Sequence, residues 1–453
     1  MPIFDIELTD EILSSNAGII LVGEILCSDD FKAIFSKQSN NSQEEYSDYA
    51  IVKSYMGLLS FGKSDYEAID DYRDDVLFKL SLELEKIPSK ERLRQRLEAL
   101  STDTFNIAIE KYNTLFIRKK GILKTCLNTH FIPVDFDVTP FDNSGTKKEK
   151  VSLTYKKFDG FAPMMTYIGG TGFMLNNEMR EGKAHSNCQG TADYIKRTLN
   201  YAKTLTDRPL LARFDSGNDS IENIYTINQQ GDISYLIKGN RRRTPEDVFI
   251  GQAKGEGAVI EYPREGKTIF YNSLMVNYEH IDTNGEKHKV QTLRVIRCVE
   301  RTIDKNGQYL LMPQTDVDFW NTNLIGYSEK EIIKLYADHG TSEQFHSEYK
   351  TDMDLERLPS GKFKTNSLII KLGMAVFNIL RAIGEQTLAS GFIFKKRPVQ
   401  RIRIRKVIQN IMYMACRFFI RNKRKVIRIA NTNPYASSLI FANKTLLKQS
   451  DFK

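Results

Sequence analysis

Two acidic residues follow strand-like segments at positions where a carboxylate could do chemistry. Asp137 lies near the end of the segment 131–139, and Asp215 comes directly after the apolar run 209–214 and before Ser216-Gly217. Open α/β sheets place their ligand sites beyond the carboxyl ends of the strands, which is where Asp215 is expected. Since carboxylates are natural ligands of hard divalent cations, these acids could support metal-dependent chemistry.

Each of these acids also has a plainer interpretation. Strand alternation puts Asp135, Asp137 and Thr139 on one face, which could simply be an exposed strand face. Asp215 could be the N-cap of the next helix. Asp135 is a near rival to Asp137 as the first acid, and Asp142, after Pro140-Phe141, is a weaker one.

A third group of polar residues has helical spacing. Tyr336, His339, Glu343 and Lys350 stand at offsets of 0, 3, 7 and 14 within a helix predicted over about 329–350. At about 100° per residue, all four share one narrow face of a regular helix. A solvated face has the same pattern, so the spacing alone does not decide the role of these residues.

The order and flanks of these groups resemble a known family. The spacing Tyr-x2-His-x3-Glu-x6-Lys is similar to the Tyr-x2-Arg-x3-Glu-x6-Lys signature of a large group of bacterial insertion-sequence DDE transposases. In that group the first acid begins an Asp-x-Thr, matched by residues 137–139, and the second lies in an Arg-Gly-Asp-Ser-Gly-like stretch, matched by residues 213–217. The resemblance covers about 131–386, and the helical N-terminal region resembles the DNA-end-binding part of the same proteins.

The resemblance implies a DNA-cutting and DNA-joining enzyme. Asp137, Asp215 and Glu343 would hold two Mg²⁺ or Mn²⁺ ions, because two such ions can stabilise the attacking and leaving oxygens of an in-line displacement. The partners would be double-stranded DNA, both transposon ends (terminal inverted repeats) and target DNA, with a homodimer in the DNA complex. Tyr336 and Lys350 would contact DNA phosphates near the cleavage site.

Two residues leave their roles open. His339 occupies the signature's Arg position, and a histidine is charged only part of the time near neutral pH, so a phosphate contact there is an expectation only. Trp320, the only tryptophan, could stack on a flipped base of DNA, although packing in the core is favoured.

The elements that must position these residues follow from periodicity. Strands are expected over 131–139, 161–167, 172–180, 209–215 and 233–238, with helices over about 190–204, 218–229, 329–350 and 365–386. Between 240 and about 325 the chain is β-rich, and Asn284-Gly285 and Asn306-Gly307 predict tight hairpins. This order predicts an α/β RNase H-like catalytic core interrupted by an all-β insertion.

The predicted organisation has five parts. They are a helical DNA-end-binding region (1–125), the first part of the core (126–239), the β-rich insertion (240–328), the second part of the core (329–390) and a basic C-terminal region (391–453). In the helical N-terminal region, Ser89 is the predicted N-cap of a basic helix that contains Arg92 and Arg96. This helix could belong to a helix-turn-helix-like DNA reader or be an ordinary surface helix with Leu93, Leu97 and Leu100 inward.

The charge of the chain is concentrated in one segment. The net charge is +8, yet residues 395–429 hold thirteen Lys and Arg and no acid, and the rest of the chain holds 52 basic and 57 acidic residues. Clustered cations favour a polyphosphate such as DNA because binding releases counterions, although a solvated basic tail has the same composition. The basic residues are Lys395, Lys396, Arg397, Arg401, Arg403, Arg405, Lys406, Arg417, Arg421, Lys423, Arg424, Lys425 and Arg428.

The remaining features concern location and the competing functions. Five widely spaced cysteines, the lack of a signal-like N-terminus and the lack of a long uncharged apolar run predict a cytoplasmic protein without a membrane partner. The resemblance implies that the cytoplasm is that of a bacterium, with the protein associated with the nucleoid. The alternatives to a transposase are a catalytically inactive, transposase-derived DNA-binding protein and an RNase H-like nuclease that acts without transposition.

Overall fold

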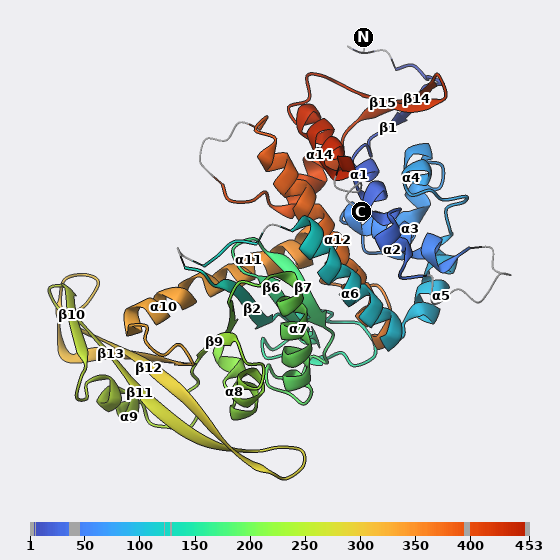
Figure 1. Ribbon diagram of the computed structural model, residues 1–453. Coiled ribbons are helices and arrows are strands. Elements are labelled where there is room, and N and C mark those ends of the chain that lie inside the picture. The colour runs from blue at the N-terminus through green and yellow to red at the C-terminus, as the bar shows by residue number, and fades with distance from the viewer. Residues whose placement is uncertain are drawn as a thin grey trace. The chain divides into compact units, whose positions relative to one another are not determined.

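The computed structural model describes residues 4, 6–35, 46–121, 123–126, 129–393 and 399–448 (Figure 1). Lys395, Lys396 and Arg397 of the basic segment lie outside the described residues. The chain forms two compact units, each built from separate stretches of sequence. Unit 1 comprises Met1–Gly121, Phe141–Val151 and Phe345–Lys453, and unit 2 comprises Ile122–Pro140 and Ser152–Gln344.

Unit 1 is a helical assembly around one long helix, α12 (Phe363–Ala389). Almost every residue of α12 between Thr365 and Thr387 is buried, because the helix contacts helices on several sides. Its neighbours include α1 (Ile19–Leu26), α3 (Asp48–Ser60), α5 (Lys90–Leu100), α6 (Asp103–Lys120) and α14 (Ala436–Lys448). The shorter helices are α2 (Asp29–Lys32), η1 (Tyr66–Tyr72) and α4 (Val76–Ser81).

Helix α12 is long and apolar enough to cross a membrane by length and composition, but 94% of its most apolar window is buried inside the structure. It also carries polar groups that meet partners from α6: Lys371 forms an ion pair with Glu110, and Asn378 donates to Asn113 at 2.7 Å. Buried polar groups are tolerated when they are paired in this way. The helix therefore has the environment of a core helix.

The C-terminal part of unit 1 adds a short helix, α13 (Ile404–Val407), a π-helical turn, η5 (Ile408–Met412), and a hairpin. The hairpin strands β14 (Cys416–Arg421) and β15 (Arg424–Ile429) form a three-stranded sheet with β1 (Ile12–Ser14), which pairs antiparallel with β14. Strand β3 (Phe141–Asp142) and the π-helical turn η4 (Glu348–Asp352) also belong to this unit.

Unit 2 is built on a nine-stranded mixed sheet with the order β10-β11-β12-β13-β9-β8-β2-β6-β7. Strand β2 runs parallel to β8, β8 runs parallel to β9, and the other pairs are antiparallel. The strands on the core side are β2 (Ile132–Val138), β6 (Met164–Ile168), β7 (Phe173–Glu178), β8 (Leu210–Phe214) and β9 (Ile233–Lys238). Two short strands, β4 (Ser152–Leu153) and β5 (Asp159–Phe161), form a separate pair.

Strand alternation sends neighbouring residues to opposite faces of this sheet. Phe136 and Phe214 stack on the face covered by α7 (Thr191–Leu205). Leu211 faces the other way, where it packs with Leu335 of α10 (Glu329–Ala337). Helices α8 (Ile221–Asn228) and α10 complete the two layers of helices around the sheet.

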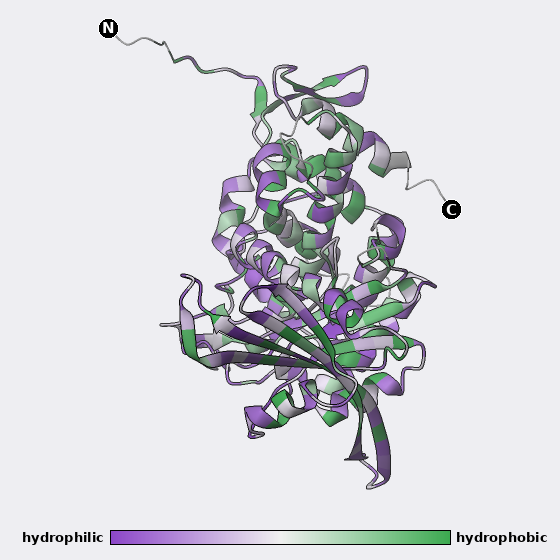
Figure 2. Cartoon of the chain, turned by 90° about the vertical axis from the view of Figure 1, so that its left-hand side faces the viewer, coloured by the Kyte–Doolittle hydropathy of each residue, from purple (hydrophilic) through white to green (hydrophobic). Residues whose placement is uncertain are grey.

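The insertion differs from the expected all-β subdomain in two ways. It contains a helix, α9 (Glu246–Ala253), and its strands extend the core sheet, because Trp320–Thr322 of β13 pair with β9. Both Asn-Gly hairpins form as predicted, with Gly285 and Gly307 at φ of 85° and 86°. Hydrophilic and hydrophobic residues are interspersed along the long strands (Figure 2). The strands are β10 (Val259–Arg264), β11 (Lys267–Ile281), β12 (Lys287–Ile303) and β13 (Tyr309–Thr322).

The helix predicted over 329–350 is interrupted. Helix α10 gives way to a 3-10 turn, η3 (Asp338–Thr341), then to α11 (Ser342–Ser347) and to the π-helical η4. Because 3-10 and π turns change the rotation per residue, the four signature positions do not share one face. His339 is 5% exposed and buried, whereas Glu343 is exposed.

Candidate active site

The first acid, Asp137, is held at the end of the central strand β2. Its Oδ1 accepts a hydrogen bond from the Val138 N–H at 2.8 Å, and its Oδ2 accepts one from the Ser342 hydroxyl at 3.1 Å. The side chain is partly exposed. Strand β2 and the start of α11 therefore orient this carboxylate together.

The second acid, Asp215, follows β8, the strand parallel to β2. Asn218, in the turn η2 (Ser216–Asn218), donates to its Oδ1. Burial raises the pKa of Asp215, and the Asp137 carboxylate raises it further. A neighbouring like charge disfavours the ionised form of a carboxyl group, as expected for two acids at the same edge of a sheet.

The third acid, Glu343, stands on the first turn of α11, next to Ser342, whose hydroxyl donates to Asp137. The hydroxyl of Tyr155 donates to the Val138 carbonyl at 3.2 Å. Burial and the charges of Asp137, Asp215 and Glu343 together raise the pKa of Tyr155 to about 12. One phenol therefore lies within electrostatic reach of all three carboxylates, although 206 residues separate Asp137 from Glu343 in the chain.

Tyr155 is not among the site residues predicted from the sequence. Its side chain is 57% exposed at the rim of the acidic group. It lies in the turn between β4 and β5, with no fixed spacing to any acid. The only sequence signal was an aromatic residue within a polar turn, Thr154 to Lys157.

The rival acid Asp135 has a structural role. It is fully buried, and both of its oxygens accept from the Arg213 guanidinium, at 2.6 and 2.8 Å. Burial alone would raise the pKa of Asp135, but Arg213 and His339 outweigh it and hold the pKa below its usual value. Asp135 is therefore committed to a buried ion pair and is not available as a metal ligand.

His339 belongs to the same buried network. Its Nδ1 lies 3.1 Å from Asp135 Oδ1, and Arg213 also donates to the Leu335 carbonyl at the end of α10, at 2.7 Å. In this structure the His339 ring is buried and faces Asp135, and the phosphate contact expected of it stays a prediction. The network fastens the end of α10 to β2 and β8, immediately before the turn that leads to Glu343.

The three remaining acids are of the residue type that binds divalent metals, although their oxygens do not form a group of ligand atoms within 4.8 Å of one another among the described residues. Asp137, Asp215 and Glu343 offer anionic oxygens, which hard cations prefer. The raised pKa of Asp215 shows that its charge is disfavoured beside Asp137. A cation bound between the carboxylates would relieve that repulsion.

A comparison of the sequence with models of protein families identifies the family of this chain. Residues 5–450 match the family model described as "Transposase DDE domain group 1". The chain belongs to this DDE transposase family. No curated protein sequence matches it. Among solved structures, the chain is similar to a piggyBac transposase in its synaptic complex with hairpin DNA, with 13% identity, a TM-score of 0.40, and coverage of 90% of this chain and 77% of that chain.

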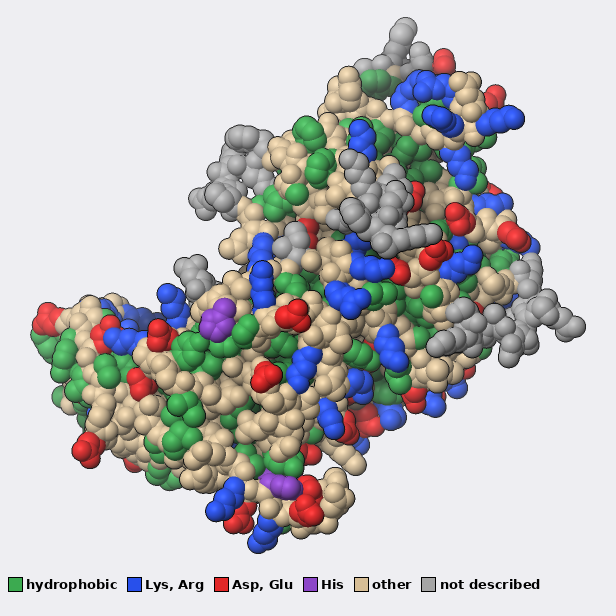
Figure 3. All heavy atoms as spheres, viewed as in Figure 1, with side chains coloured by type: hydrophobic (Ala, Val, Ile, Leu, Met, Phe, Trp, Pro, Cys, Tyr) green, Lys and Arg blue, Asp and Glu red, His purple; other side chains and the backbone are tan. Residues whose placement is uncertain are grey.

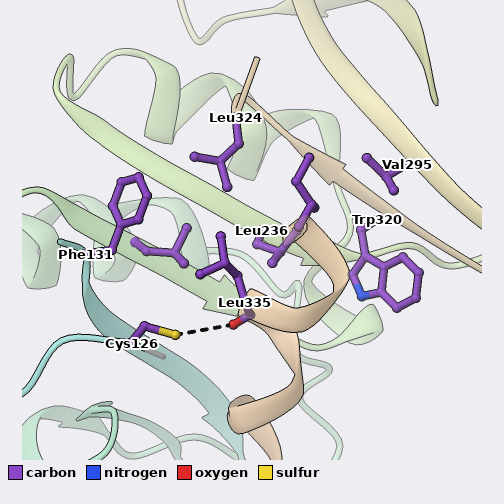
Figure 4. Packing of buried hydrophobic residues seen from close by; sticks show 9 residues of the cluster. Cys126, Phe131, Leu236, Val295, Trp320, Leu324 and Leu335 are labelled. Atoms are coloured by element: carbon purple, nitrogen blue, oxygen red, sulfur yellow. Dashed lines mark hydrogen bonds between the residues drawn. The ribbon is translucent and has the colours of Figure 1, made fainter. Parts of the chain in front are cut away.

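In this DDE transposase, Trp320 is a core residue. It is 3% exposed and lies in an apolar cluster with residues such as Leu236, Val295 and Leu335 (Figure 4). The Arg297 guanidinium lies 5.5 Å from the centre of its ring. The indole is therefore not exposed for stacking on a flipped base in this structure. Tyr336 lies at the edge of the cluster, and its ring is 6.0 Å from that of Trp320.

Two of the other residues expected to contact DNA, Lys350 and Arg96, have partners within unit 1. Lys350 forms an ion pair with Glu356 at 2.7 Å, and Arg96 pairs with Asp48. Arg92 is exposed on α5, where Ser89 caps the helix as predicted and Leu93, Leu97 and Leu100 point inward. The burial of these three leucines agrees with the interpretation of this helix as an ordinary surface helix.

Three arginines of the basic segment are also paired. Arg401 pairs with Glu348, and Arg403 and Arg405 pair with Asp352, at 2.8 and 3.1 Å. Both carboxylates come from η4 and are buried. These arginines are thus held by ion pairs within the protein, and their expected contact with DNA stays a prediction.

Proposed function

We propose that this protein is the transposase of a bacterial insertion sequence, which binds the terminal inverted repeats of its element and catalyses metal-dependent DNA cleavage and strand transfer. The observation that carries this proposal is that Asp137 and Asp215 lie at the ends of the adjacent parallel strands β2 and β8, while Ser342, next to Glu343 in the chain, donates to Asp137 at 3.1 Å. Membership of the DDE transposase family supports it.

We infer that unit 2 contains an RNase H-like core. The support is the order β7-β6-β2-β8-β9, in which an antiparallel three-stranded meander is followed by two parallel strands. The two acids stand at the carboxyl ends of the adjacent strands β2 and β8, where α/β sheets place ligands. The insertion between β9 and α10 separates the second acid from the third.

In the proposed reaction three carboxylates would bind the metal ions, and neighbouring side chains orient two of these carboxylates. Asp137, Asp215 and Glu343 would hold two Mg²⁺ or Mn²⁺ ions, which when bound supply charge stabilisation to an in-line displacement at a DNA phosphate. Ser342 orients Asp137, and Asn218 orients Asp215. Tyr336 would contact phosphates near the cut. We propose that two copies of the chain act together on a pair of DNA ends.

The test is to replace each acid by its amide. Asp137→Asn, Asp215→Asn and Glu343→Gln keep the shape but remove the charge that holds a divalent ion. Nicking of a duplex that carries the element's inverted repeat, in Mg²⁺ or Mn²⁺, should fall by about a thousandfold or more, while DNA binding survives. Strand transfer from a pre-cleaved 3′-OH end should fall with it.

The matched control is Asp142→Asn, because Asp142 is exposed and accepts from the Ser144 N–H at 2.9 Å. Asp135→Asn is unsuitable as a control, since it breaks the buried pair with Arg213. Nicking by Glu343→Gln at the parent rate would remove Glu343 from the site. A parent protein that binds the ends without cutting them would favour the inactive DNA-binding alternative, and cutting without strand transfer would favour the nuclease.

A further inference from the structure

The hairpin β14–β15 carries a group of basic residues with no acid among them. Between residues 416 and 429 the chain has six Lys and Arg and no Asp or Glu. Arg417 forms an ion pair with Glu11 at 2.8 Å. Within the described part of the chain, the other five form no ion pair; they are Arg421, Lys423, Arg424, Lys425 and Arg428, and all are exposed.

The register of the hairpin gathers four arginines on one face. Arg417 lies opposite Arg428, and Arg421 lies opposite Arg424. Between these pairs, Phe419 lies on the same face, with the guanidinium groups of Arg417 and Arg428 at 5.7 and 5.0 Å from its ring centre. Like charges directly opposite each other in a sheet destabilise it. The arrangement is therefore costly unless an anion neutralises it.

The opposite face of the hairpin fixes which way the arginines point. Cys416 and Phe418 are buried, and Ile427 and Ile429 pair with them across the strands. Alternation then directs the arginine face outward. Figure 3 shows Lys and Arg side chains gathered over this hairpin.

The tip of the hairpin extends the basic surface. The turn is made by Asn422 and Lys423, with φ of 50° and 62°, which are the left-handed conformations of a tight two-residue hairpin turn. A lysine thus stands at the tip. On the β1 side, an open depression of about 460 Å³ lies beside Arg417 and Arg428.

We propose that the outward face of the β14–β15 hairpin binds the phosphates of duplex DNA. The major groove of B-DNA admits a two-stranded ribbon, and arginine binds phosphate oxygens through two parallel N–H groups. This inference rests on the proposed function. It narrows the proposed DNA contact from the whole basic segment to the hairpin, because Arg401, Arg403 and Arg405 each form an ion pair with Glu348 or Asp352.

The test compares DNA binding by the full-length parent and by the triple variant Arg421→Ala, Arg424→Ala, Arg428→Ala. The affinity for a labelled duplex of arbitrary sequence is measured by fluorescence anisotropy over a range of salt concentrations. Each lost phosphate contact removes about 0.9 from the slope of log K against log salt, so the slope should flatten by about 2.7. The affinity near physiological salt should fall roughly tenfold to a hundredfold.

Three controls separate the possible outcomes. Lys111→Ala, Lys196→Ala, Lys289→Ala removes the same charge from scattered exposed positions and should leave the slope nearly unchanged. Replacing the three arginines with lysine should preserve most of the slope. A melting temperature of the alanine variant equal to or above the parent's would show that the fold survives the change.

The outcomes distinguish this inference from the proposed function. If the parent binds duplex DNA and the triple alanine variant binds it with the same slope, the hairpin is not part of the interface, although the transposase proposal stands. If the parent binds no duplex, both fail. Loss of binding only to phosphatidylserine-containing vesicles, with DNA binding unchanged, would assign the hairpin to a membrane surface and overturn the inference.

Discussion

The surroundings of Asp215 disfavour the ionised form of its carboxyl group. Burial and the neighbouring Asp137 raise its pKa above the ordinary value of 3.8. A carboxyl group with a raised pKa in the folded state contributes stability below its unfolded pKa, and this contribution is lost as the pH rises through the folded pKa. The metal-free protein should therefore lose stability over the acidic range just above pH 3.8, where Asp215 ionises.

This leads to a prediction for Asp215→Asn. In EDTA at neutral pH the variant should melt at a higher temperature than the parent, because it removes the opposed charge. The difference should shrink as the pH is lowered toward the ordinary pKa of the carboxyl group. Added Mn²⁺ should raise the melting temperature of the parent and have little effect on the variant, since a ligand of the folded state stabilises it. Equal melting temperatures at every pH would contradict this account.

At this scale, part of the site was predictable from sequence. Asp137 and Asp215 follow strand patterns whose direction and ends are local properties of the chain. The Asp135–Arg213 ion pair joins residues 78 positions apart. The periodicity of the sequence does not indicate whether Asp135 or Asp137 pairs with this distant arginine. Tyr155 was missed for the same reason, because its place beside the acids depends on tertiary packing.

At the scale of elements, two buried carboxylates of the turn η4 form ion pairs with arginines at the start of the described part of the basic segment. Glu348 accepts from the buried Arg381 at 2.8 Å and also pairs with Arg401. Asp352 accepts from Arg403 and from the Arg405 N–H. The segment that begins at residue 399 is therefore fastened to η4 by charge.

We predict that Arg403→Ala with Arg405→Ala lowers the stability of unit 1. The double variant leaves Asp352 buried without its cations, which should cost about 1–3 kcal/mol, less than a fully buried pair because both arginines are half exposed. Thermal melting measures this loss. Adding Asp352→Asn to the double variant should restore part of it, and the salt dependence of DNA binding should stay that of the parent. A flattened salt slope with an unchanged melting temperature would return these arginines to the DNA interface.

The elements themselves were partly predictable. The two Asn-Gly hairpins formed as expected, because a dipeptide that tolerates positive φ is a local signal. The break at Asp338–Thr341 was not expected from the spacing of four residues, although Gly340 lies within it. The pairing of β13 with β9 joins strands about 85 residues apart, and the sequence pattern of a strand does not identify its partner.

At the scale of the whole molecule, the two units are discontinuous in sequence. The chain passes from one unit to the other four times, after residues 121, 140, 151 and 344. A fragment spanning the predicted core, 126–390, would contain α12 without α3, α5 and α6. Its apolar side chains, buried in the full protein, would then face water.

We therefore predict that the fragment 126–390 is insoluble or melts without cooperativity, whereas the full chain melts cooperatively. Soluble yield and the thermal transition followed by circular dichroism measure this. A soluble fragment with a cooperative transition and metal-dependent nicking would show that unit 2 needs none of unit 1's other stretches.

The central position of α12 also has a consequence for synthesis on the ribosome. Helices α3, α5 and α6 are made before residue 121, but the helix that they pack around begins at Phe363. At about 5–20 residues per second, roughly 240 residues of intervening chain take about 12–50 s to make. During that interval the nascent N-terminal helices lack their main apolar partner, so this part of the chain should depend on chaperones until the late segment emerges.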